Sequence, residues 1–125
     1  AVFDQPAEIL APCALGGVLT PDAADRLQAR LICGAANNQL ATPGIAARLH
    51  RRGVVYLPDY VVNAGGIISV ASEIHGQDDA WRQSRLEAIA GRMQTLLQRA
   101  EAEDRTTTDL ADDMVRAILA GREVV

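Results

Sequence analysis

The chain has 125 residues, of which 49% are hydrophobic and 22% charged, a composition that fits one folded domain and excludes a disordered protein. Its net charge of −4 argues against nucleic acid and anionic membranes as partners, and no apolar run approaches the roughly 18 residues of a membrane span. Two cysteines make neither a disulfide framework nor a metal cluster, and no signal peptide is visible, so we expect a cytoplasmic protein without a bound metal.

Two short apolar runs in the first third of the chain are predicted as buried strands. Residues 8–11 run into Pro12, and residues 30–33 are broken by Gly34. Between them Thr20 can cap a helix and Pro21 suits its first position, so a helix is expected to run to about residue 29.

The same order of elements continues through residue 57. Thr42 and Pro43 predict a second capped helix that runs to residue 52, where Gly53 ends it, and residues 54–57 form a third strand. Strands that alternate with helices predict a parallel sheet. Aromatic residues are only 3%, so the core is expected to consist of Ala, Val, Ile and Leu.

The pattern becomes helical after the third strand. Asn63 is expected to open a helix that reaches residue 75, and apolar residues at helical spacing predict a long amphipathic helix over residues 79–103. Thr106 then caps a last helix, which ends at Gly121. We therefore divide the chain into a sheet segment, residues 1–75, and a C-terminal segment of two to three helices, residues 76–125.

Three parallel strands are half of a doubly wound, Rossmann-like α/β domain, in which ligands bind at the carboxyl ends of the strands. The chain has no G-x-G-x-x-G turn and no P-loop, so the other half would lie in a larger protein. Small or amide residues follow the strands in residues 12–17, 34–40 and 63–66. Such turns let a ligand approach the backbone, although they are also common as plain packing turns.

Residues 11–17, 34–40 and 56–66 resemble, in order and spacing, three consecutive motifs of the glutamate/leucine/phenylalanine/valine dehydrogenase family. The last two helices resemble the same family's C-terminal segment, so the resemblance covers nearly the whole chain. It implies an NAD-dependent oxidoreductase that deaminates an L-amino acid to a 2-oxo acid and ammonia. This chain would supply the second half of the dinucleotide-binding domain.

The resemblance also implies which residues touch the cofactor. The backbone of the first motif would pass the nicotinamide ribose, one asparagine of the second would bind the cofactor or substrate, and the asparagine of the third would contact the nicotinamide carboxamide. A turn asparagine or a helix cap is the alternative for these amides. The implied set is Cys13, Ala14, Leu15, Ala35, Ala36, Asn37 and Asn63.

Four residues are expected to contact the substrate: Asn37, Asn38, Ile67 and Val70. Ile67 and Val70 lie three apart and share a helix face, which lines the substrate side-chain pocket in the family. Glutamate-using relatives carry a hydroxyl at the second position, because a buried carboxylate needs a polar partner. Val70 cannot donate a hydrogen bond, so we expect leucine, valine, isoleucine or phenylalanine as substrate; the alternative is that both residues belong to the core.

The departures from the family concern catalysis. Its catalytic lysine and aspartate lie outside the resemblance, and all 12 basic residues of this chain are arginines, so no catalytic residue is assigned and the chain alone is expected to be inactive. The residue that separates NAD from NADP lies outside these motifs. A non-catalytic binding or assembly module stays the competing hypothesis. The edge of the strand at residues 8–11 is expected to recruit a second copy, giving a homo-oligomer.

Overall fold

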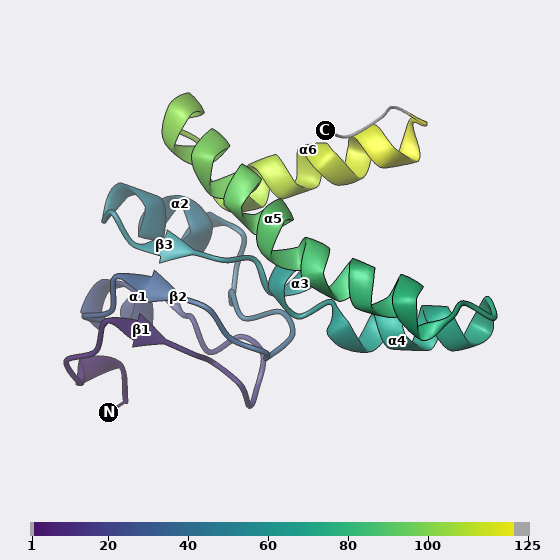
Figure 1. The fold of residues 1–125 in the computed structure, drawn as a ribbon. Coiled ribbons are helices and arrows are strands. Elements are labelled where there is room, and N and C mark those ends of the chain that lie inside the picture. Colours follow the sequence, from purple (N-terminus) through teal and green to yellow (C-terminus); the bar gives the residue numbers. More distant parts are fainter. Residues whose placement is uncertain (1, 122–125) are drawn as a thin grey trace.

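The structure, a computed structural model, describes residues 2–121 and contains one parallel sheet with the strand order β1-β2-β3 (Figure 1). The strands are Ile9–Leu10, Leu31–Ile32 and Val55–Tyr56, and β2 pairs with both neighbours in parallel. The predicted α/β class and the parallel sheet are confirmed. The strands are shorter than predicted because their flanking residues pair only through single backbone bonds, such as Cys33 N–H to the Leu10 carbonyl at 3.0 Å.

Two helices connect the strands: α1 (Pro21–Arg26) and α2 (Gly44–Arg51). Thr20 caps α1 as predicted, because its hydroxyl accepts the Ala23 N–H at 3.1 Å. The predicted cap at Thr42 is wrong: the backbone of Pro43 is already helical before α2 and no side chain caps the helix. Helix α1 also ends before residue 29, because Leu27 adopts an extended backbone.

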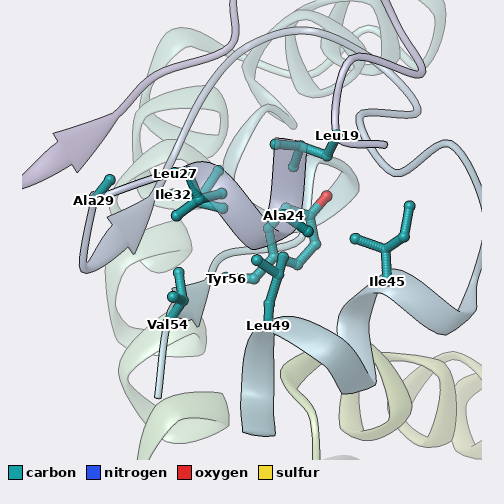
Figure 2. Packing of buried hydrophobic residues seen from close by; sticks show 9 residues of the cluster. All are labelled: Leu19, Ala24, Leu27, Ala29, Ile32, Ile45, Leu49, Val54 and Tyr56. Atoms are coloured by element: carbon teal, nitrogen blue, oxygen red, sulfur yellow. The ribbon is translucent and has the colours of Figure 1, made fainter. Parts of the chain in front are cut away.

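The first hydrophobic cluster fills the space between the sheet and these two helices (Figure 2). It is aliphatic apart from one tyrosine, as the low aromatic content predicts. Each large aliphatic side chain that is fully buried contributes about 1.5–3 kcal/mol relative to its exposed state. Its members are Leu19, Ala24, Leu27, Ala29, Ile32, Ile45, Leu49, Val54 and Tyr56.

The remaining elements are helices: η1 (Val2–Asp4), α3 (Asp59–Val62), α4 (Gly65–Ile74), α5 (Asp79–Glu103) and α6 (Thr107–Leu119). Helix α5 has the predicted bounds and crosses the molecule, with α4 beside its first half and α6 beside its second half (Figure 1). Thr106 caps α6 as expected, accepting the Asp109 N–H at 3.1 Å. Within residues 2–121 no helix has both the length and the apolar character needed to cross a membrane.

A second hydrophobic cluster joins α3, α5 and α6, so the helices after β3 have their own core. Burial is confined to the second half of α5, where α6 packs, whereas the predicted apolar positions Leu86 and Ile89 are only partly buried. The buried members are Val61, Met93, Leu96, Ala100, Leu110 and Ala111. The boundary proposed at residue 75 stays a prediction.

Polar side chains tie this helical layer to the rest of the protein. The Thr107 hydroxyl, which is buried, donates to the carbonyl of Tyr56 in β3. The Tyr60 hydroxyl donates to Asp112 Oδ1 at 3.2 Å, and its burial, together with the charge of Asp112, raises the pKa of Tyr60. His50 Nε2 lies 2.9 Å from Asp104 Oδ1 and joins α2 to the end of α5.

We expect Thr107→Val to lower the free energy of unfolding by about 1–3 kcal/mol, because it leaves a buried carbonyl at Tyr56 without its donor while keeping the side-chain shape. The measurement is urea unfolding followed by circular dichroism. Thr95→Val is the matched control: its hydroxyl bonds the exposed Gly91 carbonyl within α5, so this variant should change stability by less than about 0.5 kcal/mol. Equal effects of the two substitutions would contradict this role of Thr107.

Candidate cofactor and substrate site

The loops that follow β1 and β2 are joined by backbone hydrogen bonds just beyond the carboxyl ends of the strands (Figure 1). The Ala36 N–H donates to the Pro12 carbonyl at 2.8 Å, and the Gly17 N–H donates to the Asn38 carbonyl at 2.7 Å. Leu19 and Leu40 then form a parallel bridge, which extends this pairing. Residues 12–17 and 34–40 therefore lie side by side, as the predicted topology requires.

Two glycines allow this close approach. A Cβ atom at Gly34 would lie 2.2 Å from the Pro12 carbonyl oxygen, and one at Gly16 would lie 2.6 Å from the Asn37 carbonyl oxygen. Both neighbours are backbone atoms, which cannot move aside as a flexible side chain can. Gly34 and Gly16 thus act in packing the two loops together, which is the structural alternative raised for the glycine-bearing turns.

Asn63 brings the third motif to the same place. Its Nδ2 donates to the Ala35 carbonyl at 2.7 Å and approaches Asn37 Oδ1 at 3.5 Å. Asn63 does not open the following helix, in contrast to the prediction: it ends the short helix α3, and α4 begins at Gly65 after Ala64. The chain turns between the two helices here, and the turn frees the amide for the neighbouring loop instead of capping.

Two exposed carboxamides consequently stand together at the rim formed by these three segments, which we call the amide rim (Ala35, Asn37, Asn63). Within residues 2–121, Asn63 Oδ1 accepts no hydrogen bond and Asn37 Nδ2 donates none. One free acceptor and one free donor are the complement of a primary amide, which carries both kinds of group. The nicotinamide ring carries such an amide, so the residues present fit this cofactor.

The remaining predicted cofactor residues divide into exposed and buried positions. Cys13, Ala14 and Leu15 are exposed on the first loop, and Ala35 is exposed on the second. Ala36 is buried, and both its N–H and its carbonyl are bound within the loops, by Pro12 and Gln39. Its place is beneath the amide rim.

Asp59 supports the second loop from below. Asn38 has a left-handed backbone with φ 54°, and its N–H donates to Asp59 Oδ2 at 3.0 Å. The Tyr56 hydroxyl donates to Asp59 Oδ1 at 3.1 Å. Burial of the Tyr56 hydroxyl raises its pKa, and the negative charge of Asp59 raises it further. Asp59, the first residue of α3, therefore joins β3 to the neighbouring loop.

Gln39 is a supporting residue that the sequence reading did not single out. It is fully buried, and its Nε2 donates to the carbonyls of Gly34 and Ala36, both at 2.9 Å. These bonds close the second loop on itself. In the sequence Gln39 is the last of three consecutive amide residues, and this pattern does not distinguish a buried amide from an exposed one. Its Oε1 is buried without a protein partner among the described residues.

Ile67 and Val70 lie exposed on α4, with 69% and 49% of their surfaces accessible. Neither belongs to the two hydrophobic clusters of the described residues, and their role at the substrate stays a prediction. Ser72, on the opposite side of the helix, is buried and its hydroxyl donates to the Ser69 carbonyl at 2.8 Å. The structure thus presents an apolar strip on α4, without a described residue packed over it.

A parallel sheet with helical connections and clustered loops at its carboxyl ends is half of a doubly wound α/β fold. The comparisons agree: the family model described as Glutamate/Leucine/Phenylalanine/Valine dehydrogenase matches residues 1–120. The chain belongs to this family of amino-acid dehydrogenases.

Curated relatives and solved structures show how far the likeness extends. The chain is 61% identical to valine dehydrogenase of Streptomyces coelicolor over 71 residues, which are 57% of this chain and 20% of that protein. It is 41% identical to leucine dehydrogenase of Bacillus subtilis over 97 residues, 78% of this chain and 27% of that protein. L-tryptophan dehydrogenase from Nostoc punctiforme superposes with a TM-score of 0.85 at 37% identity, covering 90% of this chain and 34% of that one.

This chain therefore spans only about a fifth to a third of the length of the proteins that it matches. The family model matches the whole segment that carries the three loops and the C-terminal helices.

We expect Gly34→Ala to destabilise the protein by roughly 2 kcal/mol or more, because the added methyl group meets the Pro12 backbone and overpacking of this kind is not relieved by a rotamer change. Gly91→Ala is the matched control. Gly91 lies within α5 with nothing within 4 Å of an added Cβ, so the same substitution should stabilise the protein by about 0.5–1 kcal/mol. Both are measured by urea unfolding. A stable Gly34→Ala protein would contradict the close packing of the two loops.

Proposed function

We propose that this chain is the nicotinamide- and substrate-facing part of an NAD-dependent L-amino-acid dehydrogenase, which converts an apolar amino acid to its 2-oxo acid and ammonia. The observation that carries the proposal is the amide rim, where the second and third motifs meet and leave one amide donor and one amide acceptor free. Membership of an amino-acid dehydrogenase family supports the reaction class.

The exposed surfaces suggest how the cofactor is held. Asn63 Oδ1 would accept from the amide nitrogen of the nicotinamide, and Asn37 Nδ2 would donate to its oxygen. The small residues Cys13 and Ala14 leave the first loop open for the adjoining ribose. The cofactor, when bound, accepts the hydride that leaves the substrate Cα.

The apolar strip on α4 supports the choice of substrate. Ile67 and Val70 offer only hydrocarbon surface, which suits a branched-chain or aromatic side chain and leaves the distal carboxylate of glutamate unpaired. The relatives named above are dehydrogenases of valine, leucine and tryptophan, which agrees with an apolar side chain. Asn37 and Asn38, both exposed, would contact the substrate's polar end.

Proton transfers are assigned to residues outside these 125. The chain contains no lysine, and we name no catalytic residue in it. We propose that the full-length protein adds these groups across from the amide rim, and that the 125-residue chain by itself has no turnover. A homo-oligomer is proposed as the assembly, since β1 pairs with β2 alone and has a free edge among the described residues.

We expect Asn37→Ala in the full-length protein to weaken NAD binding about tenfold, the loss of one net hydrogen bond to the ring amide. Binding of ADP-ribose, which lacks the nicotinamide, should stay unchanged. Isothermal titration calorimetry measures both dissociation constants. Gln28→Ala, on the exposed surface beside η1, is the control and should alter neither. Parallel weakening of NAD and ADP-ribose would contradict a ring contact at Asn37.

Substrate class has a separate test. The full-length protein should use leucine, valine, isoleucine or phenylalanine with a far higher kcat/KM than glutamate. Val70→Ser should lower kcat/KM for the best of these by roughly tenfold or more, because it removes apolar surface from the pocket. Ser69→Ala, one residue away on another face of α4, should leave it unchanged. Glutamate as the best substrate would refute the assignment of Val70.

A further inference from the structure

Asp59 is a buried carboxylate without a cationic partner in the part of the chain that the structure describes. It is 8% exposed, and none of the ion pairs formed by residues 2–121 includes it. Its two hydrogen bonds come from neutral donors, the Tyr56 hydroxyl and the Asn38 N–H. Both partners are donors, which suits an ionised carboxylate. No positively charged side chain of residues 2–121 forms an ion pair with it to neutralise this charge.

Asp59 is hydrogen-bonded to both segments that form the amide rim. Asp59 Oδ2 accepts from Asn38, the residue next to Asn37, and the Asp59 carbonyl accepts the Asn63 N–H at 2.7 Å. Asp59 therefore contacts the residue next to Asn37, and it lies one helical turn before Asn63. We therefore expect a ligand amide bound between Asn37 and Asn63 to feel the charge of this carboxylate, which its burial shields from water.

The two forms of a nicotinamide ring differ in charge. The oxidised ring carries one positive charge and the reduced ring none, whereas the riboses, phosphates and adenine are the same in both. A buried charge is screened less by water and salt than an exposed one, so its interaction with the oxidised ring is retained at physiological ionic strength.

We propose that Asp59 sets the relative affinity of the site for the two oxidation states of the cofactor: its negative charge strengthens binding of the oxidised nicotinamide and leaves binding of the reduced form nearly unchanged. This inference rests on the proposed function. The charge effect can be told apart from the structural role of Asp59 in holding the second loop. Displacement of that loop would weaken binding of the oxidised and the reduced cofactor alike.

The test compares Asp59→Asn with Tyr56→Phe in the full-length protein. Asparagine has the shape of aspartate and can still accept the Asn38 N–H, but it removes the charge. Phenylalanine at position 56 removes one hydrogen bond to Asp59 and keeps the charge. Dissociation constants for oxidised NAD, reduced NAD and ADP-ribose are measured by calorimetry at two salt concentrations.

We expect Asp59→Asn to weaken the binding of oxidised NAD by about three- to tenfold, as for the loss of a unit charge in partly buried surroundings. The affinities for reduced NAD and ADP-ribose should change by less than about twofold. Tyr56→Phe should preserve the wild-type ratio of the two affinities. Equal weakening of both forms, or no change in their ratio, would overturn the inference. Failure of the wild-type protein to bind any of the three ligands would instead refute the proposed function.

A measurement on the unmodified protein decides the matter if Asp59→Asn does not fold. With ADP-ribose saturating the remainder of the site, the protein is titrated with 1-methylnicotinamide, a cation, and with neutral nicotinamide, and binding is followed by NMR. The cation should bind about three- to tenfold more tightly. Equal affinities, or a preference for the neutral ring, would overturn the inference.

Discussion

The close packing of the loop after β1 against the loop after β2 is the constraint on which the candidate site depends. Gly34 and Gly16 place backbone against backbone where any side chain would collide, and bonds such as that from Ala36 to Pro12 hold the contact. Leu19 and Leu40, at the ends of these loops, pack into the first cluster and so anchor the loops to the core. Their exposed residues, Cys13 and Asn37 among them, are therefore presented on a rigid base.

A second layer of polar contacts adds the third segment. Asp59, the first residue of α3, accepts hydrogen bonds from Tyr56 of β3 and from Asn38 in the second loop, and Gln39 closes that loop from within. Burying a carboxylate costs free energy, and hydrogen bonds offset that cost only in part. The hydrogen bonds that Asp59 accepts fix the position of the second loop, and its charge is the basis of the proposed preference for the oxidised cofactor.

The helices after β3 give the site a different kind of surface. Helix α4 packs on α5 through its inner side and leaves Ile67 and Val70 uncovered, while α5 and α6 have a core of their own. Hydrogen-bonding groups and apolar surface thus come from neighbouring stretches of one chain. This division matches what an enzyme requires when one part of its ligand is polar and another is a hydrocarbon side chain.

Local signals were enough for much of the fold. The residues at Thr20, Thr106 and Gly53 mark helix ends because capping and left-handed turns depend on neighbouring residues alone. The bounds of α5 and the three parallel strands followed from hydrophobic periodicity and element order, and the family from the three motifs. The predicted cap at Thr42 was wrong because the backbone of the following Pro43 is already helical.

The sequence by itself determined the order of elements, the parallel sheet and the motifs that meet at its carboxyl end, since these depend on local chemistry and chain topology. Only the tertiary structure decided that Asn63 binds Ala35 rather than capping a helix, that Gln39 and Asp59 are buried beneath the amide rim, and that Ile67 and Val70 are exposed. The contacts of Asn63 with Ala35 and of Asp59 with Asn38 join residues more than 20 positions apart, and burial depends on which faces the rest of the chain covers, neither of which local sequence specifies.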